Sequence, residues 1–312
     1  MKVLITGVSG LIGGRIAVVC RKRGWNVSGI DIKDTEDGDI DFHKGSIMDI
    51  QLLRKAMRDC DFVFHEAAAS SSPMFHPDPA PGIGINVEGS MNVFSTALHE
   101  NVSKVVAAST SSIYGNLPLP SKEEQLIEST PNMYAASKLS MEALGSSYST
   151  VTGLPVVFLR YFSVYGLGER KKGKIANMLS QFLWDALELD GKGRKPVIFG
   201  DGKQTRDLIF ADDIAEANVQ AALSSAKSGV FNVGTGRETS LNELIAMISG
   251  VIGREIKADY VENPINNYIY RTLADTSKCR KTIGFASTVS VTDGIKSIVK
   301  ELTGGAHGKT GT

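Results

Sequence analysis

Two side chains one helical turn apart carry the clearest chemical signal in this sequence. Tyr134 and Lys138 lie at i and i+4 in the run Tyr-Ala-Ala-Ser-Lys, so on a helix they share one face. A free tyrosine has a pKa of about 10 and is a poor base, but a neighbouring ammonium favours the phenolate and lowers that pKa. The pair could exchange a proton with a substrate hydroxyl, although ordinary amphipathic helices show the same spacing.

A cluster of hydroxyl side chains precedes this pair in the chain. Ser109-Thr110-Ser111-Ser112 comes directly after the apolar run Lys104–Ala108, which has the pattern of a buried strand. Ligands bind at the carboxyl ends of strands in open parallel sheets. A Ser or Thr at this place could therefore hydrogen-bond the substrate oxygen that Tyr134 deprotonates.

A glycine-rich turn lies close to the N-terminus, between the apolar run Val3–Ile5 and an expected helix. Its sequence is Gly7-Val8-Ser9-Gly10-Leu11-Ile12-Gly13. Glycines in such a turn let the backbone approach a pyrophosphate, whose charge is met by backbone N–H groups and by the helix N-terminus. The spacing G-x-x-G-x-x-G is a weak signal alone, and its place after the first strand is what predicts a dinucleotide site.

Asp31 ends the second expected strand, and its carboxylate indicates which dinucleotide is bound. A carboxylate here can accept hydrogen bonds from the adenosine ribose, and it would repel the additional phosphate of NADP. Lys33 could meet a phosphate, and Asp31 could instead cap a turn. The interpretation that we favour is an NAD site.

The elements that must position these residues alternate along the chain. Strands at Val3–Ile5, Trp25–Ile30, Asp61–His65, Lys104–Ala108 and Val156–Arg160 alternate with helices at Leu11–Arg23, Ile50–Arg58, Gly84–Asn101 and Met133–Thr150. This order is typical of βαβ units in a doubly wound parallel sheet. We therefore expect an α/β Rossmann-type fold with a smaller α/β substrate domain. The NAD-binding domain is expected at 1–165 plus 207–232, and the substrate domain at 166–206 plus 233–312.

Charge and cysteine content narrow the class of protein. The formal net charge is +0, so no overall field favours nucleic acid or an anionic membrane. Cys20, Cys60 and Cys279 lie far apart without a C-x-x-C spacing, so we expect neither a disulfide framework nor a metal site. The apolar run at the N-terminus is too short for a signal peptide or a membrane span, and we expect a cytoplasmic protein. The charged run Glu169–Lys174 is expected to be a solvated loop or, alternatively, a lid over an anionic ligand.

The order of the motifs resembles the extended short-chain dehydrogenase/reductases, in the branch of nucleotide-sugar epimerases and dehydratases, with UDP-glucose 4-epimerases most similar. The resemblance covers nearly the whole chain. The segments that carry it are Thr6–Gly13, Phe64–Ala68, Ser109–Gly115, Tyr134–Lys138, Leu159–Gly166, Gly200–Asp207, Asp212-Asp213, Phe231–Gly236 and Ala274–Lys278.

The resemblance implies a role for many residues. It implies that Thr110, Tyr134 and Lys138 are catalytic, with Tyr134 as the acid and base and Lys138 as the ligand of the nicotinamide ribose. The positions implied for NAD are Gly7, Ser9, Gly10, Leu11, Ile12, Gly13, Asp31, Ile32, Lys33, Ser46, Ile47, Glu66, Ala67, Ala68, Ser70, Asn86, Ala108, Ser109, Tyr134, Lys138, Tyr161, Ser163 and Val164. Those implied for a UDP-sugar are Ser71, Thr110, Ser112, Ser163, Asn177, Met178, Val197, Phe199, Gln204, Arg206 and Arg271.

The residues after Thr110 indicate which reaction of the family to expect. Dehydratases of this family carry an Asp-Glu pair there, and related decarboxylases carry a glutamate at the place of Ser112, whereas this chain has Ser111-Ser112. Without an added acid and base, the expected reaction is inversion of C4 of a UDP-sugar through a transient 4-keto sugar, with NAD kept tightly bound. A 4,6-dehydratase or a reductase of the same family stays open, and so does a non-catalytic NAD-sensing protein.

Two departures from the family pattern concern the ligands. Gly45-Ser46 stands where the family often has a Gly-Asp pair that contacts adenine. The run Ile265-Asn266-Asn267-Tyr268 replaces an Arg-Pro-Gly-Asp stretch whose arginine binds phosphate, and Arg271 could supply that cation or could be an exposed strand residue. The resemblance also implies a homodimer formed through the helices near 84–101 and 133–150.

Overall fold

Apolar runs that are buried on both faces form the centre of the structure, a computed structural model that describes residues 1–304 except 36, 190, 192, 193 and 266. All residues of β5 (Lys104–Thr110) and β6 (Val156–Tyr161) are buried, as expected of central parallel strands. With β1 (Lys2–Thr6), β2 (Asn26–Asp31), β3 (Asp41–Lys44), β4 (Phe62–His65) and β11 (Gly229–Val233) they form a parallel sheet in the order β11-β6-β5-β4-β1-β2-β3. The order reverses between β1 and β4, so their carboxyl ends border the crevice where such sheets bind ligands.

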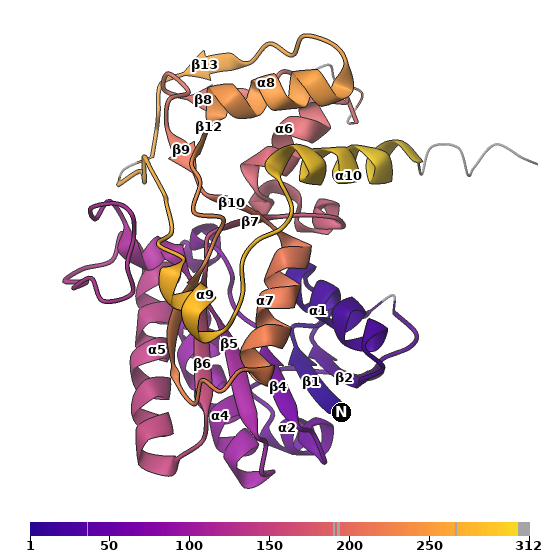
Figure 1. Cartoon of the computed structure of the whole chain (residues 1–312), viewed down its shortest axis with the longest axis vertical. Coiled ribbons are helices and arrows are strands. Elements are labelled where there is room, and N and C mark those ends of the chain that lie inside the picture. Colours follow the sequence, from indigo (N-terminus) through magenta and orange to yellow (C-terminus); the bar gives the residue numbers. More distant parts are fainter. Residues whose placement is uncertain (36, 190, 192–193, 266, 305–312) are drawn as a thin grey trace, which may run out of the picture.

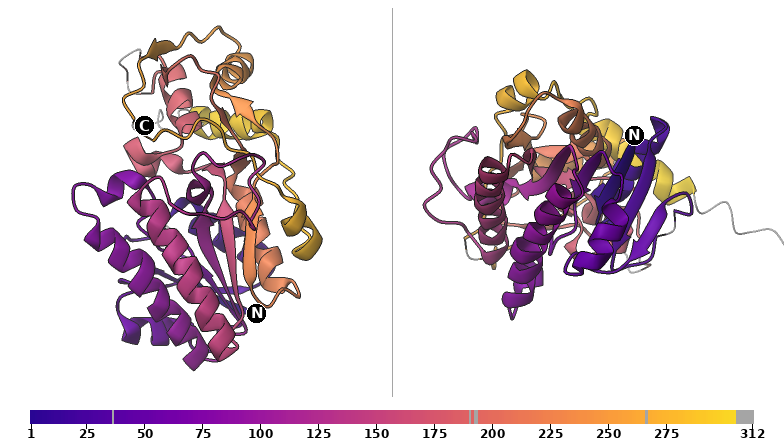
Figure 2. Two further views of the ribbon diagram at one scale, coloured as in Figure 1. Left: turned by 90° about the vertical axis from the view of Figure 1, so that its left-hand side faces the viewer. Right: turned by 90° about the horizontal axis from the view of Figure 1, so that it is seen from below.

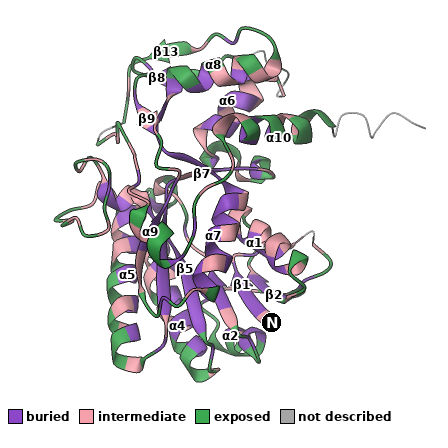
Figure 3. Ribbon diagram, viewed as in Figure 1, coloured by how far each residue is buried: buried purple, intermediate pink, exposed green. Residues whose placement is uncertain are grey.

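Helices cover both faces of this sheet (Figures 1 and 2). One face packs on α1 (Leu11–Lys22), α7 (Ala211–Leu223) and α9 (Ser277–Thr282). The other packs on α2 (Ile50–Met57), α4 (Ser90–His99) and α5 (Met133–Thr152), with α3 (Ala80–Ile83) and the π-helical turn η2 (Gly84–Gly89) leading into α4. The strands are buried, and the exposed residues of these helices face outward (Figure 3). The family resemblance and this architecture agree on a Rossmann-type fold.

A smaller body sits above the carboxyl ends of the strands (Figure 1). Its apolar core is separate from the two cores of the sheet. It contains β7 (Ser163–Tyr165), α6 (Met178–Ala186), β8 (Val197–Phe199), β9 (Thr205–Arg206), β10 (Leu208–Phe210), β12 (Thr239–Ser240), α8 (Leu241–Ile252), β13 (Asp259–Val261) and α10 (Val291–Gly304). Its strands pair two by two, as β10-β7, β12-β9 and β13-β8. The division at 166, 207 and 233 stays a prediction, and residues 305–312 of the expected substrate domain lie outside the described part.

Two buried carboxylates tie the chain together where the bodies meet. Asp207 accepts hydrogen bonds from the backbone N–H groups of Thr235, Gly236 and Ala274 at 2.7–3.0 Å. Asp213, near the start of α7, accepts from the backbone N–H groups of Thr288 and Val289 at 3.0 Å. Burying a carboxylate costs free energy unless such donors satisfy it. The segments that contain these donors, at 235–236, 274 and 288–289, are therefore held in one position.

The expected elements agree with the structure except at two places. The expected helix Gly84–Asn101 is continuous from Gly84 to His99, but its first part, η2, is π-helical rather than α-helical. The expected loop Glu169–Lys174 lies within a 3₁₀ segment, η4 (Glu169–Ile175), and Glu169 is buried. Its carboxylate accepts from the Ser180 hydroxyl at 2.6 Å and from the backbone N–H of Asn177 at 2.8 Å, which anchors the segment on α6. The expected exposure to solvent is therefore confirmed for Arg170, Lys171 and Lys174, whereas Glu169 is buried, and the alternative of a lid stays a prediction. Among the described residues, no helix combines the length and apolar composition of a membrane span.

Candidate active site

The glycine turn between β1 and α1 packs its backbone against neighbouring backbone. Gly7 has a φ of 73°, and a Cβ on it would lie 2.7 Å from the backbone nitrogen of Ala67. A Cβ on Gly13 would collide with the carbonyl oxygen of Gly7. Both positions require glycine. Because Gly7 and Gly13 carry no side chains, a ligand can lie directly against the main chain of the turn and the N-terminus of α1. The turn also contains Ser9, Gly10, Leu11 and Ile12.

Asp31 stands beside this turn at the end of β2, as the sequence predicts. Its carboxylate accepts from the backbone N–H groups of Ser9 at 3.0 Å and Lys33 at 2.9 Å. The Ser9 hydroxyl donates to the carbonyl of Lys33 at 3.0 Å. The side chains of Ile32 and Lys33 are exposed, so both flank the site. Asp31 thus fixes the turn, and each oxygen retains a lone pair for a further donor.

The segments after β3 and β4 contribute both exposed and buried side chains. Ile47 is buried in the core and can offer the site only its backbone, whereas Ser46 is half-buried. Asn86 is also buried, and its amide bonds the backbone of Ala69 and the hydroxyl of Ser137. Asn86 therefore positions the loop after β4 against α5. In that loop Ala67, Ala68 and Ser70 remain accessible, and the buried hydroxyl of Ser71 has no partner among the described residues.

The three candidate catalytic side chains meet at the carboxyl end of β5. Asn132 caps the N-terminus of α5 by accepting from the backbone N–H of Ala135 at 2.9 Å, which sets the helix that carries Tyr134 and Lys138. The phenol of Tyr134 lies next to Thr110, the last residue of β5, close enough for the Thr110 hydroxyl to act on its pKa. Lys138 is buried, and its Nζ donates to the carbonyl of Ala108 at 2.8 Å. The cluster that the sequence predicts is therefore assembled.

Burial dominates the electrostatics of this cluster. It raises the pKa of Tyr134, a rise that the hydrogen bond from Thr110 opposes. Burial lowers the pKa of Lys138 to about 8. The sequence predicts that Lys138 lowers the pKa of Tyr134, whereas desolvation of the phenol is the largest influence on that pKa and raises it. A cationic group bound next to the phenol would act in the lowering direction.

Glu66 is the titratable group whose behaviour the sequence does not reveal. Burial raises its pKa to about 7, against the opposing effects of a hydrogen bond from Tyr161 and the charge of Lys138. The Tyr161 hydroxyl accepts from the amide of Asn218 at 2.8 Å and donates to Glu66 at 2.8 Å. The loop after β4, which carries Glu66, is thus joined through Tyr161 of β6 to Asn218 of α7. Together they hold an easily protonated carboxyl group beside Lys138. No spacing in the sequence signals this group, because its partners come from β6 and α7.

Ser109, on the same strand as Thr110, points away from the site. Its hydroxyl donates to Glu142 of α5, which also receives two hydrogen bonds from Arg160 at 2.6 and 2.9 Å. Any contact of Ser109 with a cofactor would therefore use its backbone. Ser111 and Ser112 form a 3₁₀ turn after β5, and the backbone N–H of Ser112 donates to the Thr110 hydroxyl at 3.1 Å.

The expected substrate residues lie between the sheet and the smaller body. Asn177 caps α6, just before Met178, and its amide donates to the carbonyl of Val164 next to Ser163. The buried amide of Gln204 donates to the carbonyl of Phe199 at 2.6 Å. Val197, at the start of β8, is exposed. These contacts align three short segments along one side of the crevice.

Arg206 is the cation best placed for an anionic ligand, and Arg271 does not join it. Arg206 is buried, donates to the carbonyls of Thr205 and Tyr270, and lies 5.3 Å from the ring centre of Tyr268. Arg271 is exposed and forms a bidentate ion pair with Glu238 at 2.7 and 2.9 Å. The expectation that Arg271 replaces the missing phosphate arginine is not supported, because its charge is already paired. Of the run Ile265-Asn266-Asn267-Tyr268, Asn266 lies outside the described residues.

Metal-ligating side chains do not gather into a site in the part of the chain that the structure describes. In it, no three His, Cys, Asp or Glu side chains are arranged to hold a metal ion.

Comparisons with known proteins agree with this geometry. The model of the NAD dependent epimerase/dehydratase family matches residues 3–234. The putative UDP-glucose 4-epimerase of Methanocaldococcus jannaschii is 32% identical over 305 residues, which cover 95% of this chain and 97% of that protein. The UDP-N-acetylglucosamine 4-epimerase of Methanobrevibacter ruminantium, solved with UDP-N-acetylmuramic acid, has a TM-score of 0.89 and 30% identity over 97% of this chain and 98% of its own.

A further solved structure contains both a cofactor and a nucleotide sugar. The UDP-glucuronic acid 4-epimerase of Bacillus cereus, in complex with UDP-glucuronic acid and NAD, has a TM-score of 0.85 and 26% identity, covering 97% of this chain and 99% of its own. The similarity extends over both bodies of the structure, and so over both sides of the crevice.

Proposed function

Because the chain belongs to the NAD dependent epimerase/dehydratase family, we propose that it is a UDP-sugar 4-epimerase that uses tightly bound NAD. The observation that carries the proposal is the assembled cluster of Thr110, Tyr134 and Lys138, with only serines at 111 and 112. This set supplies one group for proton transfer, Tyr134, and two neighbours that position it, Thr110 and Lys138. A dehydratase would need an additional acid and base at those positions.

The residues at the sheet edge fit NAD. The backbone crossing of Gly7 and Gly13 leaves the start of α1 open to a pyrophosphate, and the carboxylate of Asp31 has lone pairs for ribose hydroxyls. The accessible Ala67, Ala68, Ser163 and Val164 would border the remaining length of the dinucleotide. When bound, NAD supplies reversible oxidation of the sugar at C4. Lys138, already oriented by Ala108, would hold the nicotinamide ribose.

The protein's own residues perform the proton transfer. Tyr134 takes the proton of the 4-hydroxyl as C4 becomes a ketone, and returns it when the ketone is reduced from the opposite face. Thr110, next to Tyr134, would hydrogen-bond and orient the reacting oxygen. The positive charge of Lys138, together with that of the oxidised nicotinamide ring, would favour the phenolate against the desolvation of the phenol. One group therefore serves as base and acid in a single catalytic cycle.

The nucleotide part of the substrate binds to the smaller body in this proposal. Arg206 holds the diphosphate, since a guanidinium forms paired hydrogen bonds to phosphate oxygens. Asn177, Met178, Val197, Phe199 and Gln204 border the nucleoside, while Ser71, Ser112 and Ser163 face the sugar. Ser71 supports this assignment, because its buried hydroxyl lacks a partner among the described residues. A firm grip on the nucleotide and a loose grip on the sugar allow the ketone to turn over in the site.

The decisive experiment is to incubate the purified protein with UDP-glucose, UDP-N-acetylglucosamine and UDP-glucuronate and to identify the products by NMR. We expect one of them to interconvert with its C4 epimer without added NADH. Tyr134→Phe should reduce the rate at least about 100-fold, while Tyr148→Phe on the same helix should not. Stoichiometric consumption of NADH would instead identify a reductase, and inversion of none of the sugars would overturn the proposal.

We also propose a homodimer in the cytoplasm. α4 and α5 pack side by side at one edge of the molecule (Figure 2), and Leu98, Leu144 and Val151 on them are exposed. The three cysteines are buried free thiols, which suits a reducing compartment. Light scattering should give twice the mass of the chain, and Leu144→Glu should give monomers. A monomeric unmodified protein would overturn the dimer.

A further inference from the structure

A cavity opens on the side of α9, apart from the candidate active site. It has a volume of about 430 Å³ and is lined by the end of β11, the loop into β12, α8, α9, the segment 285–290 and the start of α10. None of its lining residues is among those assigned above to catalysis, NAD or the UDP-sugar. The volume lies within the range of about 300–1,000 Å³ that is usual for small-molecule pockets.

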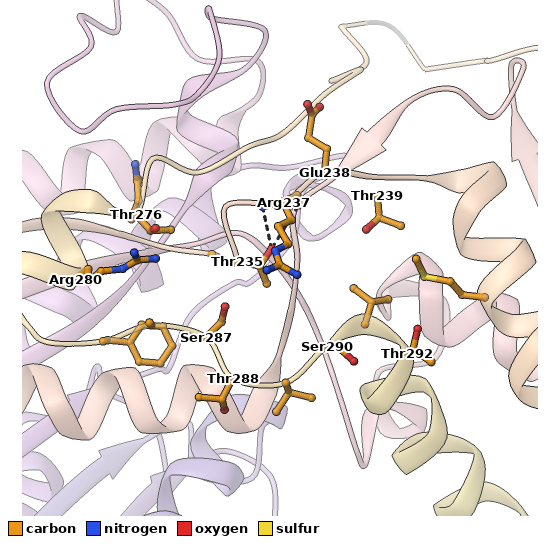
Figure 4. A pocket seen from close by; sticks show the side chains of 17 residues that line it. Thr235, Arg237, Glu238, Thr239, Thr276, Arg280, Ser287, Thr288, Ser290 and Thr292 are labelled. Atoms are coloured by element: carbon orange, nitrogen blue, oxygen red, sulfur yellow. Dashed lines mark hydrogen bonds between the residues drawn. The ribbon is translucent and has the colours of Figure 1, made fainter.

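Two guanidinium groups face this cavity. Arg237, from the loop before β12, and Arg280, from α9, extend toward the space between them (Figure 4). Among the described residues, neither guanidinium has an ion pair or a hydrogen bond. The one acidic residue of the lining, Glu238, is bound to Arg271 and to the Thr205 hydroxyl, and it points away from Arg237 (Figure 4). The cavity therefore carries local positive charge in a protein whose net charge is +0.

Hydroxyl groups provide most of the other polar atoms of the lining. Thr235, Thr276 and Ser287 lie around the space between the two arginines (Figure 4). Within the described part of the chain, no hydrogen bond uses the side-chain hydroxyls of Thr276 and Ser287. Two cations and free hydroxyls together suit a ligand that has a dianionic group and several hydroxyls of its own.

The walls of the cavity are fixed before any ligand arrives. The hydroxyl and backbone N–H of Thr235 donate to buried Asp207 at 2.6 and 2.7 Å. The hydroxyl of Thr288 donates to buried Asp213 at 2.8 Å, next to the backbone bonds described above. Binding to walls that are already ordered costs less entropy than binding to loops that must first be ordered.

We propose that this cavity is a second ligand site, which binds a sugar phosphate with its phosphate monoester between Arg237 and Arg280. A phosphate monoester carries a charge of about −1.5 to −2 at neutral pH, which matches the two positive charges of the guanidinium groups. A carboxylate ligand, with a single negative charge, would match only one of them. The sugar hydroxyls meet Thr276, Ser287 and their neighbours.

The test is calorimetric titration with glucose 6-phosphate, inorganic phosphate and glucose, with UDP present in saturating amount to fill the proposed nucleotide site. We expect glucose 6-phosphate to bind more tightly than phosphate, and glucose not to bind. Arg280→Ala and Arg237→Ala should each weaken binding about 10-fold or more. Ser287→Glu should abolish it by placing a carboxylate between the arginines.

Lys281→Ala is the matched control, because it removes the same charge from the next residue of α9, which does not line the cavity. Melting temperatures of all variants show whether they remain folded. The proposal is overturned if UDP prevents binding, if Lys281→Ala weakens it as much as Arg280→Ala, or if neither phosphate compound binds at millimolar concentration. None of these outcomes depends on the proposed epimerase activity.

Discussion

Glu142 and Glu66 both bind residues of β6, Glu142 from a buried position and Glu66 from a half-buried one, yet their surroundings differ in the charge that they provide. Successive strand residues point to opposite faces, so Arg160 meets Glu142 on one face of the sheet and Tyr161 meets Glu66 on the other. Glu142 receives two hydrogen bonds from a guanidinium, which also donates to Tyr114 at 2.8 Å. Glu66 receives one from a neutral phenol.

The difference shows which carboxylate is structural. Burial alone would lower the pKa of Arg160, but the hydrogen bonds and charge of Glu142 raise it, so Arg160 keeps its positive charge beside Glu142. For Glu66, burial dominates and raises the pKa to about 7. The first carboxylate holds α5 to the sheet below the candidate active site. The second can gain or lose a proton near neutral pH, next to Lys138, where the reaction is proposed to occur.

The largest effect is expected from breaking the compensated pair. Arg160→Met leaves the Glu142 carboxylate buried without its cation and should lower the free energy of unfolding by about 3–5 kcal/mol. Urea denaturation measures this. The double variant Glu142→Met with Arg160→Met should recover most of the loss, because no charge is then left buried. A loss below about 1 kcal/mol in the single variant would contradict the assignment.

Glu66→Gln tests the uncompensated carboxyl through pH. A carboxyl whose pKa is raised from 4.5 to about 7 contributes stability below pH 4.5, and that contribution is lost as the pH rises through 7. The amide of glutamine does not titrate. The free energy of unfolding of Glu66→Gln minus that of the unmodified protein should therefore increase by about 1–3 kcal/mol between pH 5 and pH 8. A difference that does not vary with pH would show that Glu66 keeps an ordinary pKa.

Tyr161→Phe should sharpen the same contrast with a smaller effect. It removes the donor of Glu66 and the acceptor of Asn218, at a cost of about 1 kcal/mol. Because that hydrogen bond lowers the pKa of Glu66, its loss should shift the pH dependence of stability to higher pH. Tyr148→Phe is the control, since no hydrogen bond of its hydroxyl occurs among the described residues. A shift to lower pH in Tyr161→Phe would contradict this account.

The smallest effect is expected at an ion pair that is not buried. Arg271 is bidentate to Glu238, as Arg160 is to Glu142, but its side chain is 59% exposed. Arg271→Ala should change the free energy of unfolding by less than about 1 kcal/mol, because solvent screens the pair. It should leave the affinity for UDP unchanged as well. A marked loss of UDP affinity would instead restore Arg271 as a phosphate ligand.

Much of the fold was predictable because its signals are local. Continuous apolar runs placed β1, β4, β5 and β6, and each agrees with the structure to within a few residues. The glycine turn was predictable as well, since a Cβ on Gly13 would collide with the backbone of Gly7 in the same turn. The 3₁₀ segment at Glu169 was not, because the partner that buries its carboxylate, Ser180, belongs to the next helix.

The sequence by itself determined the composition of the candidate catalytic group. Tyr134 and Lys138 are one helical turn apart, Thr110 ends a strand, and the order of the motifs identifies the family. Only the tertiary structure decided the electrostatic environment of these residues. Whether a carboxylate is ionised depends on the solvent and charges around it, and these come from segments distant in the chain. Thus Glu142 has Arg160, Glu66 has only a phenol, Arg271 is already paired, and Arg237 faces Arg280 across a cavity.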